Sequence, residues 1–377
     1  MFIIVKTILK VKLITDEAQH SALLRTMHTF NNVCNQISEK AFQKQEFQKI
    51  QLHHIVYKEM REAHPEFSSQ LTIRAIDVVS CSYKIKRWKR PNGFKRTSAV
   101  VYDDRCITFR GTESVNIWTY EGRLNIPIRI CNKERFAFRK GQVDLILQND
   151  TFFLLVTLEI STPEKYNAEG VIGVDMGVKN IAVTSNGEVF SGHDIEKKRQ
   201  QYHSHRQRLQ KRGTRSARRR IKISGNKEAR FRKDTNHVIS KLIVQKAEGT
   251  RHAIALEELS HNNKRVTVRK ANRNERMSWS FAQLRSYIAY KAELKGVPLV
   301  IVPTPYTSQT CSECGHCEKK NRKSQSEFLC MSCGHTENAD FNASKNIAKL
   351  GEQSISLLLA QPKAELVASH TPWACGS

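Results

Sequence analysis

The sequence contains no apolar run that approaches the roughly 20 residues needed to form a membrane-spanning helix. Its first 15 residues are basic and apolar, but they lack the small-residue cleavage site of a secretory signal peptide. Polar and apolar residues nearly alternate there, which favours a β-strand. We therefore expect a cytoplasmic protein without membrane contact.

Acidic residues are scarce, because 36 Asp and Glu face 62 Lys and Arg and leave a net charge of +26. A polyphosphate backbone is the polyanion best suited to neutralise such an excess. Residues 195–233 hold sixteen Lys and Arg but only two acidic residues. A charged run is usually a solvated face, yet one this unbalanced would repel itself without a polyanion. The predicted nucleic-acid-binding residues are Arg206, Arg208, Lys211, Arg212, Arg215, Arg218, Arg219, Arg220, Arg230 and Arg232.

Half of the ten cysteines lack the paired spacing of a disulfide or metal framework. In a cytoplasmic chain, scattered cysteines of this kind are typical of buried thiols. A disulfide-stabilised fold is therefore not expected. These five are Cys34, Cys81, Cys106, Cys131 and Cys375.

The remaining cysteines crowd into one segment and include two C-x-x-C pairs. Cys311 and Cys314 form the first pair, and Cys330 and Cys333 follow after fifteen intervening residues. Each pair can chelate one tetrahedral metal ion, and two pairs complete a closed structural zinc site. Such an ion replaces a hydrophobic core that is too small to fold alone. The neighbouring Cys317, His316 and His335 break the paired spacing and are interpreted as non-ligating.

The N-terminal half combines β-type and helical patterns. After a predicted strand over residues 1–14, apolar residues recur every three or four positions, which is typical of amphipathic helices. The last of these helices is predicted from about Leu71 to Trp88. A β-module made of residues 1–14 and 92–168 is thus predicted to contain a helical insertion over residues 15–91.

The C-terminal half follows the order β-β-β-α-β-α-β-α, which is that of an RNase H-like nuclease core. This core is predicted over residues 169–304 and 339–352, with an amphipathic helix at 275–295. The cysteine segment, residues 305–338, is an insertion in it, and residues 353–377 are predicted to be a flexible tail. The fold class is therefore α+β with several domains.

Three carboxylates fall at element ends of this predicted core. Asp175 ends the first strand, Glu257 ends the fourth, and Asp340 opens the last helix. Separately, Asp175 can be a turn residue, Asp340 a helix cap, and either Glu257 or Glu258 a solvated charge. Together they predict a catalytic site, because clustered carboxylates favour Mg²⁺ or Mn²⁺. Two such ions can activate water and stabilise the leaving oxygen of a phosphodiester.

Four segments carry a recognisable pattern: GVDMG at 173–177, LEEL at 256–259, YTSQTCSECG at 306–315 and NADFNASKNI at 338–347. Together they resemble the TnpB proteins, which are transposon-encoded RNA-guided DNA endonucleases also labelled OrfB-type transposases. The resemblance is specific from about residue 170 to residue 350. In the N-terminal half it fits only in outline, as a wedge β-barrel with a helical recognition insertion.

The resemblance implies a RuvC-like nuclease whose Mg²⁺ ligands are Asp175, Glu257 and Asp340. It implies that the zinc-bound insert contacts the target nucleic acid. A guide RNA would direct cleavage of double-stranded DNA beside a short transposon-adjacent motif. The protein would act as a monomer within this ribonucleoprotein, in the prokaryotic cytoplasm at the nucleoid. Some family members carry Asp where Asn338 stands, so a role for Asn338 beside the metal ligands stays open.

Two other functions remain open at the level of the sequence. The first is a cleavage-inactive RNA-guided DNA-binding regulator, which would be marked by loss of one of the three carboxylates. The second is a DNA-binding transposition factor that uses a zinc ribbon and no guide. A discrete RNA that co-purifies with the protein would distinguish a guided protein from this factor.

Overall fold

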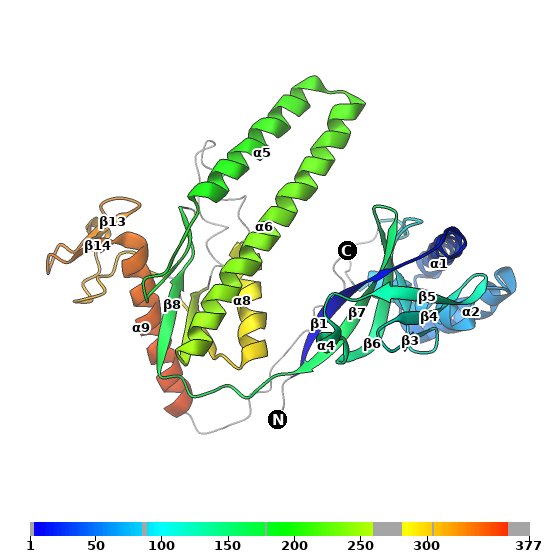
Figure 1. Cartoon of the computed structure of the whole chain (residues 1–377), viewed down its shortest axis with the longest axis horizontal. Coiled ribbons are helices and arrows are strands. Elements are labelled where there is room, and N and C mark those ends of the chain that lie inside the picture. The colour runs from blue at the N-terminus through cyan, green and yellow to red at the C-terminus, as the bar shows by residue number, and fades with distance from the viewer. Residues whose placement is uncertain (1–3, 85–88, 178, 259–280, 304, 361–377) are drawn as a thin grey trace. The chain divides into compact units, whose positions relative to one another are not determined.

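The computed structural model describes residues 4–84, 89–177, 179–258, 281–303 and 305–360. These residues divide into two compact units, and the first spans Ile4–Ser161 (Figure 1). The second unit begins at Thr162, seven residues before the predicted boundary. Tyr166 explains this difference, because its hydroxyl lies 3.0 Å from the Ala247 carbonyl oxygen and 2.9 Å from that of His252. Those contacts attach the connecting segment to the second unit.

The first unit is built on a seven-stranded antiparallel sheet. Its order is β2-β6-β7-β1-β5-β4-β3, so the two edge strands are consecutive along the chain and only residues 103–106 join them. This connection makes the sheet nearly closed, which confirms the predicted β-barrel. The strands are β1 (Ile4–Leu13), β2 (Val100–Tyr102), β3 (Ile107–Arg110), β4 (Ser114–Thr119), β5 (Gly122–Arg129), β6 (Arg139–Gln148) and β7 (Thr151–Ser161). A short helix, α4 (Lys133–Phe136), precedes β6.

Three helices between β1 and β2 form the predicted insertion: α1 (Glu17–Lys44), α2 (Lys49–Ala63) and α3 (Ser69–Ser82). Helix α1 starts at a capping box in which the Asp16 carboxylate accepts a 2.7 Å hydrogen bond from the backbone of Gln19. Buried residues of these helices and of the barrel share one hydrophobic core. Helix α3 ends before the predicted limit, and Trp88 lies outside the described residues.

The second unit contains a five-stranded sheet in the order β10-β9-β8-β11-β12. Strands β8, β11 and β12 run parallel, whereas β9 and β10 pair antiparallel. Numbered within the unit the order is 3-2-1-4-5, as in the RNase H-like core that the sequence predicts. Its elements are β8 (Gly170–Asp175), β9 (Asn180–Thr184), β10 (Val189–Ser191), α5 (His193–Arg212), α6 (Arg215–Gly249), β11 (His252–Glu257), α8 (Phe281–Lys295), β12 (Leu299–Val302) and α9 (Ala339–Ala360). Residues 275–280 of the predicted helix lie outside the described residues.

The two faces of this sheet carry different helices. Ile172, Val174 and Leu256 pack in a cluster with residues of α6 and α8. Val171 and Ala255 occupy the alternate positions and pack in a second cluster with residues of α9. Because side chains alternate between the faces of a strand, the last residues of β8 and β11 are directed towards the α9 face.

Two glycines allow α9 to approach the sheet closely. A Cβ atom on Gly173 of β8 would lie 2.1 Å from the Ser344 carbonyl oxygen and 2.4 Å from the Ala348 nitrogen. On the helix, a Cβ atom on Gly351 would lie 2.7 Å from the Cβ of Ala255. The backbones of α9 and β8 therefore meet at a distance that only glycine permits.

Helix α9 continues to Ala360, so the prediction that a flexible tail begins at residue 353 is wrong. Its apolar stripe extends beyond that point and reaches Ile355, which packs against the α9-side cluster. Residues 361–377 lie outside the described residues. No helix among the described residues combines the length and apolar character required to cross a bilayer.

Gly173→Ala is expected to lower the free energy of unfolding by about 1–3 kcal/mol, because the new methyl group would overlap the α9 backbone. Urea denaturation followed by circular dichroism measures this loss. Gly225→Ala is the matched control, since a Cβ atom there meets no atom within 4 Å. In the middle of α6 it is expected to stabilise by about 0.5–1 kcal/mol. Equal stability of the Gly173→Ala variant and the parent would contradict the close packing.

Candidate active site and zinc-type cluster

The fold brings the three predicted carboxylates together on the α9 face of the sheet. Asp175 ends β8 and Glu257 ends the neighbouring parallel strand β11, where Val174 is in register with Leu256. Asp340 lies in the first turn of α9, the helix that packs on β8. Parallel strands end at the same sheet edge, so two strand ends and one helix start meet there. Glu257 and Asp340 are buried, and Asp175 is partly buried.

This clustering is electrostatically unfavourable in the absence of a cation. Loss of solvation raises the pKa of Asp175 to about 7, and the negative charges of Glu257 and Asp340 add to this effect. Burial also raises the pKa of Glu257, against the hydrogen bond from Thr307. Carboxylates whose ionised form is disfavoured by their surroundings, as at Asp175 and Glu257, are donors that a hard divalent cation stabilises. By the chemistry of their donor atoms, the three residues are candidate ligands for Mg²⁺ or Mn²⁺.

Three further side chains contact these carboxylates, and sequence reasoning missed their positions. The Arg322 guanidinium lies 3.5 Å from Asp340 Oδ1, and Asn180 Nδ2 donates a 3.0 Å hydrogen bond to Asp340 Oδ2. The Thr307 hydroxyl donates to Glu257 Oε1. Arg322 lies among lysines, so its local sequence predicts contact with phosphate and not an ion pair with Asp340. Thr307 does lie in a recognisable motif, just before the first cysteine pair.

The structure also resolves two alternatives left by the sequence. Glu258 is exposed, whereas Glu257 is buried beside the other carboxylates. Asn338 caps α9, because its Oδ1 accepts hydrogen bonds from the backbone nitrogens of Asp340 at 3.0 Å and Phe341 at 3.3 Å. The Asp340 side chain is thereby left to face Asn180 and Arg322 instead of serving as the cap.

The four paired cysteines form one compact cluster. Their sulfur atoms lie within 4.8 Å of one another, with 3.7 Å between Cys311 and Cys333 and 3.6 Å between Cys314 and Cys330. Zinc bound by four thiolates at about 2.3 Å in a tetrahedron separates neighbouring sulfurs by roughly 3.8 Å. The observed spacings fit this geometry, and the cluster could hold zinc as the sequence predicts.

Both cysteine pairs have the same backbone arrangement. The first cysteine of each pair accepts a 3.0 Å hydrogen bond from a glycine four residues on, Gly315 or Gly334. Each glycine has a positive φ, 75° and 74° respectively, which favours glycine. The histidine after each glycine pairs with a glutamate, Glu318 at 3.4 Å and Glu337 at 3.5 Å. These contacts agree with the interpretation that neither histidine is a ligand.

Little apolar material surrounds the cluster. The hairpin between β13 (Glu327–Leu329) and β14 (Thr336–Asn338) contributes Phe328 to a small core with Cys311, Cys330 and Ala339. With so small a core, a bound metal ion would supply a large share of the stability of this segment.

The basic region predicted at 195–233 folds into a helical hairpin made of α5 and the first half of α6 (Figure 1). Gly213, with a φ of 66°, ends α5, and Thr214 caps α6 by accepting a 3.2 Å hydrogen bond from Ala217. Eight of the ten predicted nucleic-acid-binding residues are exposed on it. They are Arg208, Lys211, Arg212, Arg215, Arg218, Arg219, Arg220 and Arg230.

The other two predicted nucleic-acid-binding residues, Arg206 and Arg232, are less accessible to nucleic acid. Arg206 forms an ion pair with Glu228 across the hairpin, and Arg232 is partly buried with an interaction partner of its own. An Arg held by a carboxylate must exchange that partner for a phosphate. We therefore expect these two residues to contribute less to nucleic-acid binding than their exposed neighbours.

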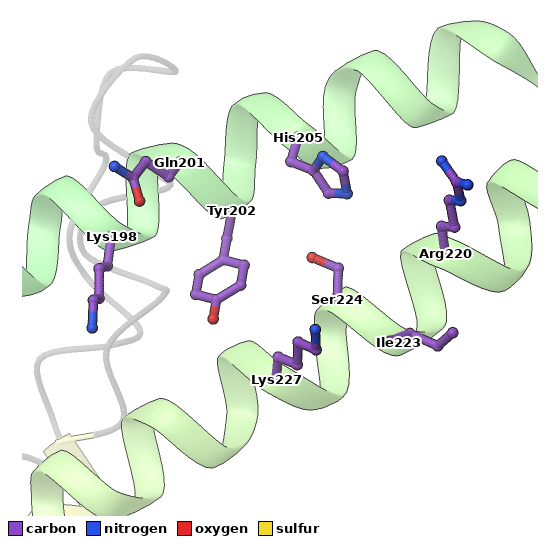
Figure 2. A pocket seen from close by; sticks show the side chains of 8 residues that line it. All are labelled: Lys198, Gln201, Tyr202, His205, Arg220, Ile223, Ser224 and Lys227. Atoms are coloured by element: carbon purple, nitrogen blue, oxygen red, sulfur yellow. The ribbon is translucent and has the colours of Figure 1, made fainter.

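A cavity of about 450 Å³ opens between the two helices of the hairpin. Figure 2 shows Tyr202 of α5 and Ser224 of α6 projecting into the space between the helices. Ser224, one of the lining residues, has a small side chain that occupies little of this space. An aromatic ring surrounded by cations can contact both a base and a phosphate. The lining residues are Lys198, Gln201, Tyr202, His205, Arg220, Ile223, Ser224 and Lys227.

The sheet order and the helices on its two faces define an RNase H-like α/β core, and the four-cysteine segment inserted in it fits a zinc ribbon. Residues 153–267 match the OrfB_IS605 family model, described as "Probable transposase". Residues 281–347 match the model described as "Cas12f1-like, TNB domain". These matches confirm the resemblance to the TnpB family and relate the chain to OrfB-type transposases and Cas12f-type nucleases.

Two curated proteins show the same relationship. "CRISPR-associated endodeoxyribonuclease Cas12f1" of Sulfoacidibacillus thermotolerans is 34% identical over 197 residues, which cover 47% of this chain and 45% of that protein. "Putative RNA-guided DNA endonuclease InsQ" of Escherichia coli (strain K12) is 32% identical over 220 residues, which cover 51% of this chain and 52% of that protein. The chain thus spans about half the length of the curated relatives it matches.

The fold extends beyond these sequence matches. The solved structure named "Cryo-EM structure of the Cas12f1-sgRNA-target DNA complex" superposes with a TM-score of 0.62 at 14% identity. The superposition covers 85% of this chain and 81% of that chain. At this low identity the likeness shows the fold, and it includes the N-terminal region, where the sequence resemblance fits only in outline.

The raised pKa of Asp175 predicts how stability varies with pH in zinc-loaded protein without Mg²⁺. Because folding raises this pKa from its usual value of about 3.9 to about 7, Asp175 stabilises the fold fully below pH 4. That contribution is lost as the pH rises through 7. The melting temperature should therefore fall from pH 5 to pH 8, and added Mg²⁺ should raise it at pH 8. Asp175→Asn should flatten the profile, whereas the exposed-site control Glu258→Gln should not; an unchanged slope in Asp175→Asn would contradict the assignment.

Proposed function

We propose that this protein is an RNA-guided DNA endonuclease of a transposable element. The observation that carries the proposal is the convergence of Asp175, Glu257 and Asp340 at one sheet edge. Mutual repulsion and desolvation make this arrangement unfavourable for a purely structural role. A divalent-metal nuclease site gives it a chemical reason.

Asp175, Glu257 and Asp340 would hold Mg²⁺ or Mn²⁺ in a two-metal, RuvC-type site. When bound, the ions would supply an activated water and stabilise the leaving oxygen of the phosphodiester. Thr307 and Asn180 would orient the carboxylates through the hydrogen bonds that they donate. Arg322 lies at the same site and could exchange its ion pair with Asp340 for a phosphate once the cations are present.

The nucleic-acid partners are a guide RNA and a double-stranded DNA target. The exposed basic residues of the hairpin would bind phosphates, and the zinc ribbon, residues 305–338, would contact the target. Base pairing with the guide would select the sequence, while the protein would read a short transposon-adjacent motif and the shape of the duplex. We further propose that the protein acts as a monomer in this ribonucleoprotein, in the prokaryotic cytoplasm at the nucleoid.

The rival functions differ from this proposal at testable points. A cleavage-inactive regulator would be expected to lack one of the three carboxylates, whereas all three are present and the charges of Glu257 and Asp340 act on Asp175. A guide-independent transposition factor would require no RNA. Sequencing the RNA bound to the purified protein decides this point, because a discrete species supports guided activity and its absence would favour the guide-independent factor.

Glu257→Gln is expected to reduce cleavage of a guide-matched DNA duplex at least 100-fold, because the amide is a poor ligand for a hard cation. Guided DNA binding should stay within about threefold, since the phosphate contacts are retained. Glu258→Gln is a matched control with the same change at the adjacent exposed position. Gel-based cleavage and binding assays in Mg²⁺ measure both quantities, and the assignment of Glu257 fails if the two variants cut equally well.

Replacing Arg218, Arg219 and Arg220 by Ala should weaken binding of the co-purified RNA, because these exposed side chains occupy one turn of the hairpin. The slope of log affinity against log salt should become shallower by roughly one for each phosphate that the protein no longer neutralises. The matched Arg→Lys triple variant keeps the charge and should keep the slope. Fluorescence anisotropy at several salt concentrations tests this, and a slope identical in all three proteins would remove the hairpin from the RNA interface.

A further inference from the structure

One short loop contacts both the buried Glu257 and the helix that carries Asp340. This loop, residues 305–312, is named the zinc loop because it ends with the first cysteine pair's Cys311 and the following serine. Thr307 is buried with a fractional exposure of 6%, and its hydroxyl donates to Glu257 Oε1. The zinc loop thus fixes one oxygen of a candidate metal ligand through this hydrogen bond.

Two buried asparagines of α9 hold the other side of the zinc loop. Asn342 donates a 2.8 Å hydrogen bond to the Thr310 carbonyl oxygen and accepts one of 2.8 Å from the Ser312 nitrogen. Asn346, one turn further along, donates to the carbonyl oxygens of Thr307 at 2.9 Å and Thr310 at 2.7 Å. Both amides are nearly fully buried, so loss of these bonds would leave polar groups without solvent.

The zinc loop is also braced internally. Tyr306 has a φ of 69°, a left-handed conformation that is unfavourable for a residue with a side chain. Its carbonyl oxygen accepts hydrogen bonds from the Gln309 nitrogen at 2.9 Å and from the Thr310 nitrogen and hydroxyl at 3.0 Å and 2.9 Å. This tight turn sets the direction in which the next residue, Thr307, projects.

The cysteine cluster anchors the end of this turn. Cys311 lies between Thr310 and Ser312, the two residues that Asn342 holds against α9. A metal ion on the four sulfurs would fix Cys311 relative to Cys330 and Cys333, which belong to the second cysteine pair of the insert. An uninterrupted series of contacts therefore leads from the sulfurs through the zinc loop to Glu257 and to α9.

We propose that the zinc loop positions the active site, with Thr307 holding Glu257 and the Asn342–Asn346 pair holding the loop to the helix of Asp340. Zinc would then set the geometry of the catalytic carboxylates as well as fold the insert. The inference rests on the proposed metal site, and it adds Thr307, Asn342 and Asn346 as positioning residues. Partners that orient metal ligands in this way typically change metal affinity by about 10–100-fold when removed.

The first test compares Thr307→Val, which removes the hydroxyl at nearly constant volume, with Thr307→Ser, which keeps it. Mn²⁺ binding to the zinc-loaded full chain is measured by electron paramagnetic resonance without nucleic acid. We expect Thr307→Val to weaken binding about 10–100-fold with unchanged zinc content, and Thr307→Ser to restore it to within about threefold. Ser308→Ala, at the next and partly exposed position, is the matched control and should bind as the parent does.

Two outcomes separate this inference from the proposed function. If the parent protein binds no Mn²⁺, the proposed metal site itself is wrong. If the parent binds Mn²⁺ and Thr307→Val binds it equally well, only the positioning role is wrong. A purely structural role of Thr307 predicts loss of stability without the selective rescue of Mn²⁺ affinity by serine.

The second test addresses the zinc ion through Cys314→Ser, which leaves every residue of the zinc loop in place. The variant should lose zinc and bind Mn²⁺ at least 10-fold more weakly, although Cys314 lies outside the carboxylate site. Circular dichroism shows whether the two main units remain folded. Mn²⁺ affinity equal to that of the parent in a zinc-free variant would overturn the link between zinc and the carboxylates, whatever the result for Thr307.

Discussion

The packing of α9 directly on β8 is the constraint on which the candidate active site depends. Asp175 and Glu257 belong to adjacent strands and share an edge by register alone, but Asp340 is far away in sequence. It joins them because Gly173 and Gly351 remove the side chains that would hold the helix off the sheet.

That close packing creates a site whose negative charge is only partly balanced by other protein groups. Three acidic side chains meet in a region of low solvation, and the pKa of Asp175 rises to about 7 as a result. Arg322 and Asn180 offset part of the negative charge at Asp340. Natural proteins retain such unfavourable clusters where a ligand relieves them, which is why divalent cations are the natural complement.

In the same unit, the two halves of α6 have different surroundings. The C-terminal half of α6 packs into the sheet core through residues such as Ile243 and Val244, whereas its N-terminal half forms the exposed basic hairpin with α5. Buried apolar contacts hold the base of the hairpin in place. The exposed arms carry long cationic side chains that can adjust to an irregular polyphosphate backbone without disturbing the carboxylates.

The sequence by itself determined the type and order of most elements, the paired spacing of the four cysteines and the choice of three candidate carboxylates, because period, cap and spacing are local properties of the chain; it misplaced the end of α9, which runs to Ala360. Only the tertiary structure decided which basic side chains are exposed to solvent and which form ion pairs within the protein. Arg218 is exposed, whereas Arg322 pairs with Asp340. The tertiary structure also revealed the link from Thr307 to Glu257, fifty residues apart. Such contacts depend on how separate elements meet in space, and no local pattern encodes that.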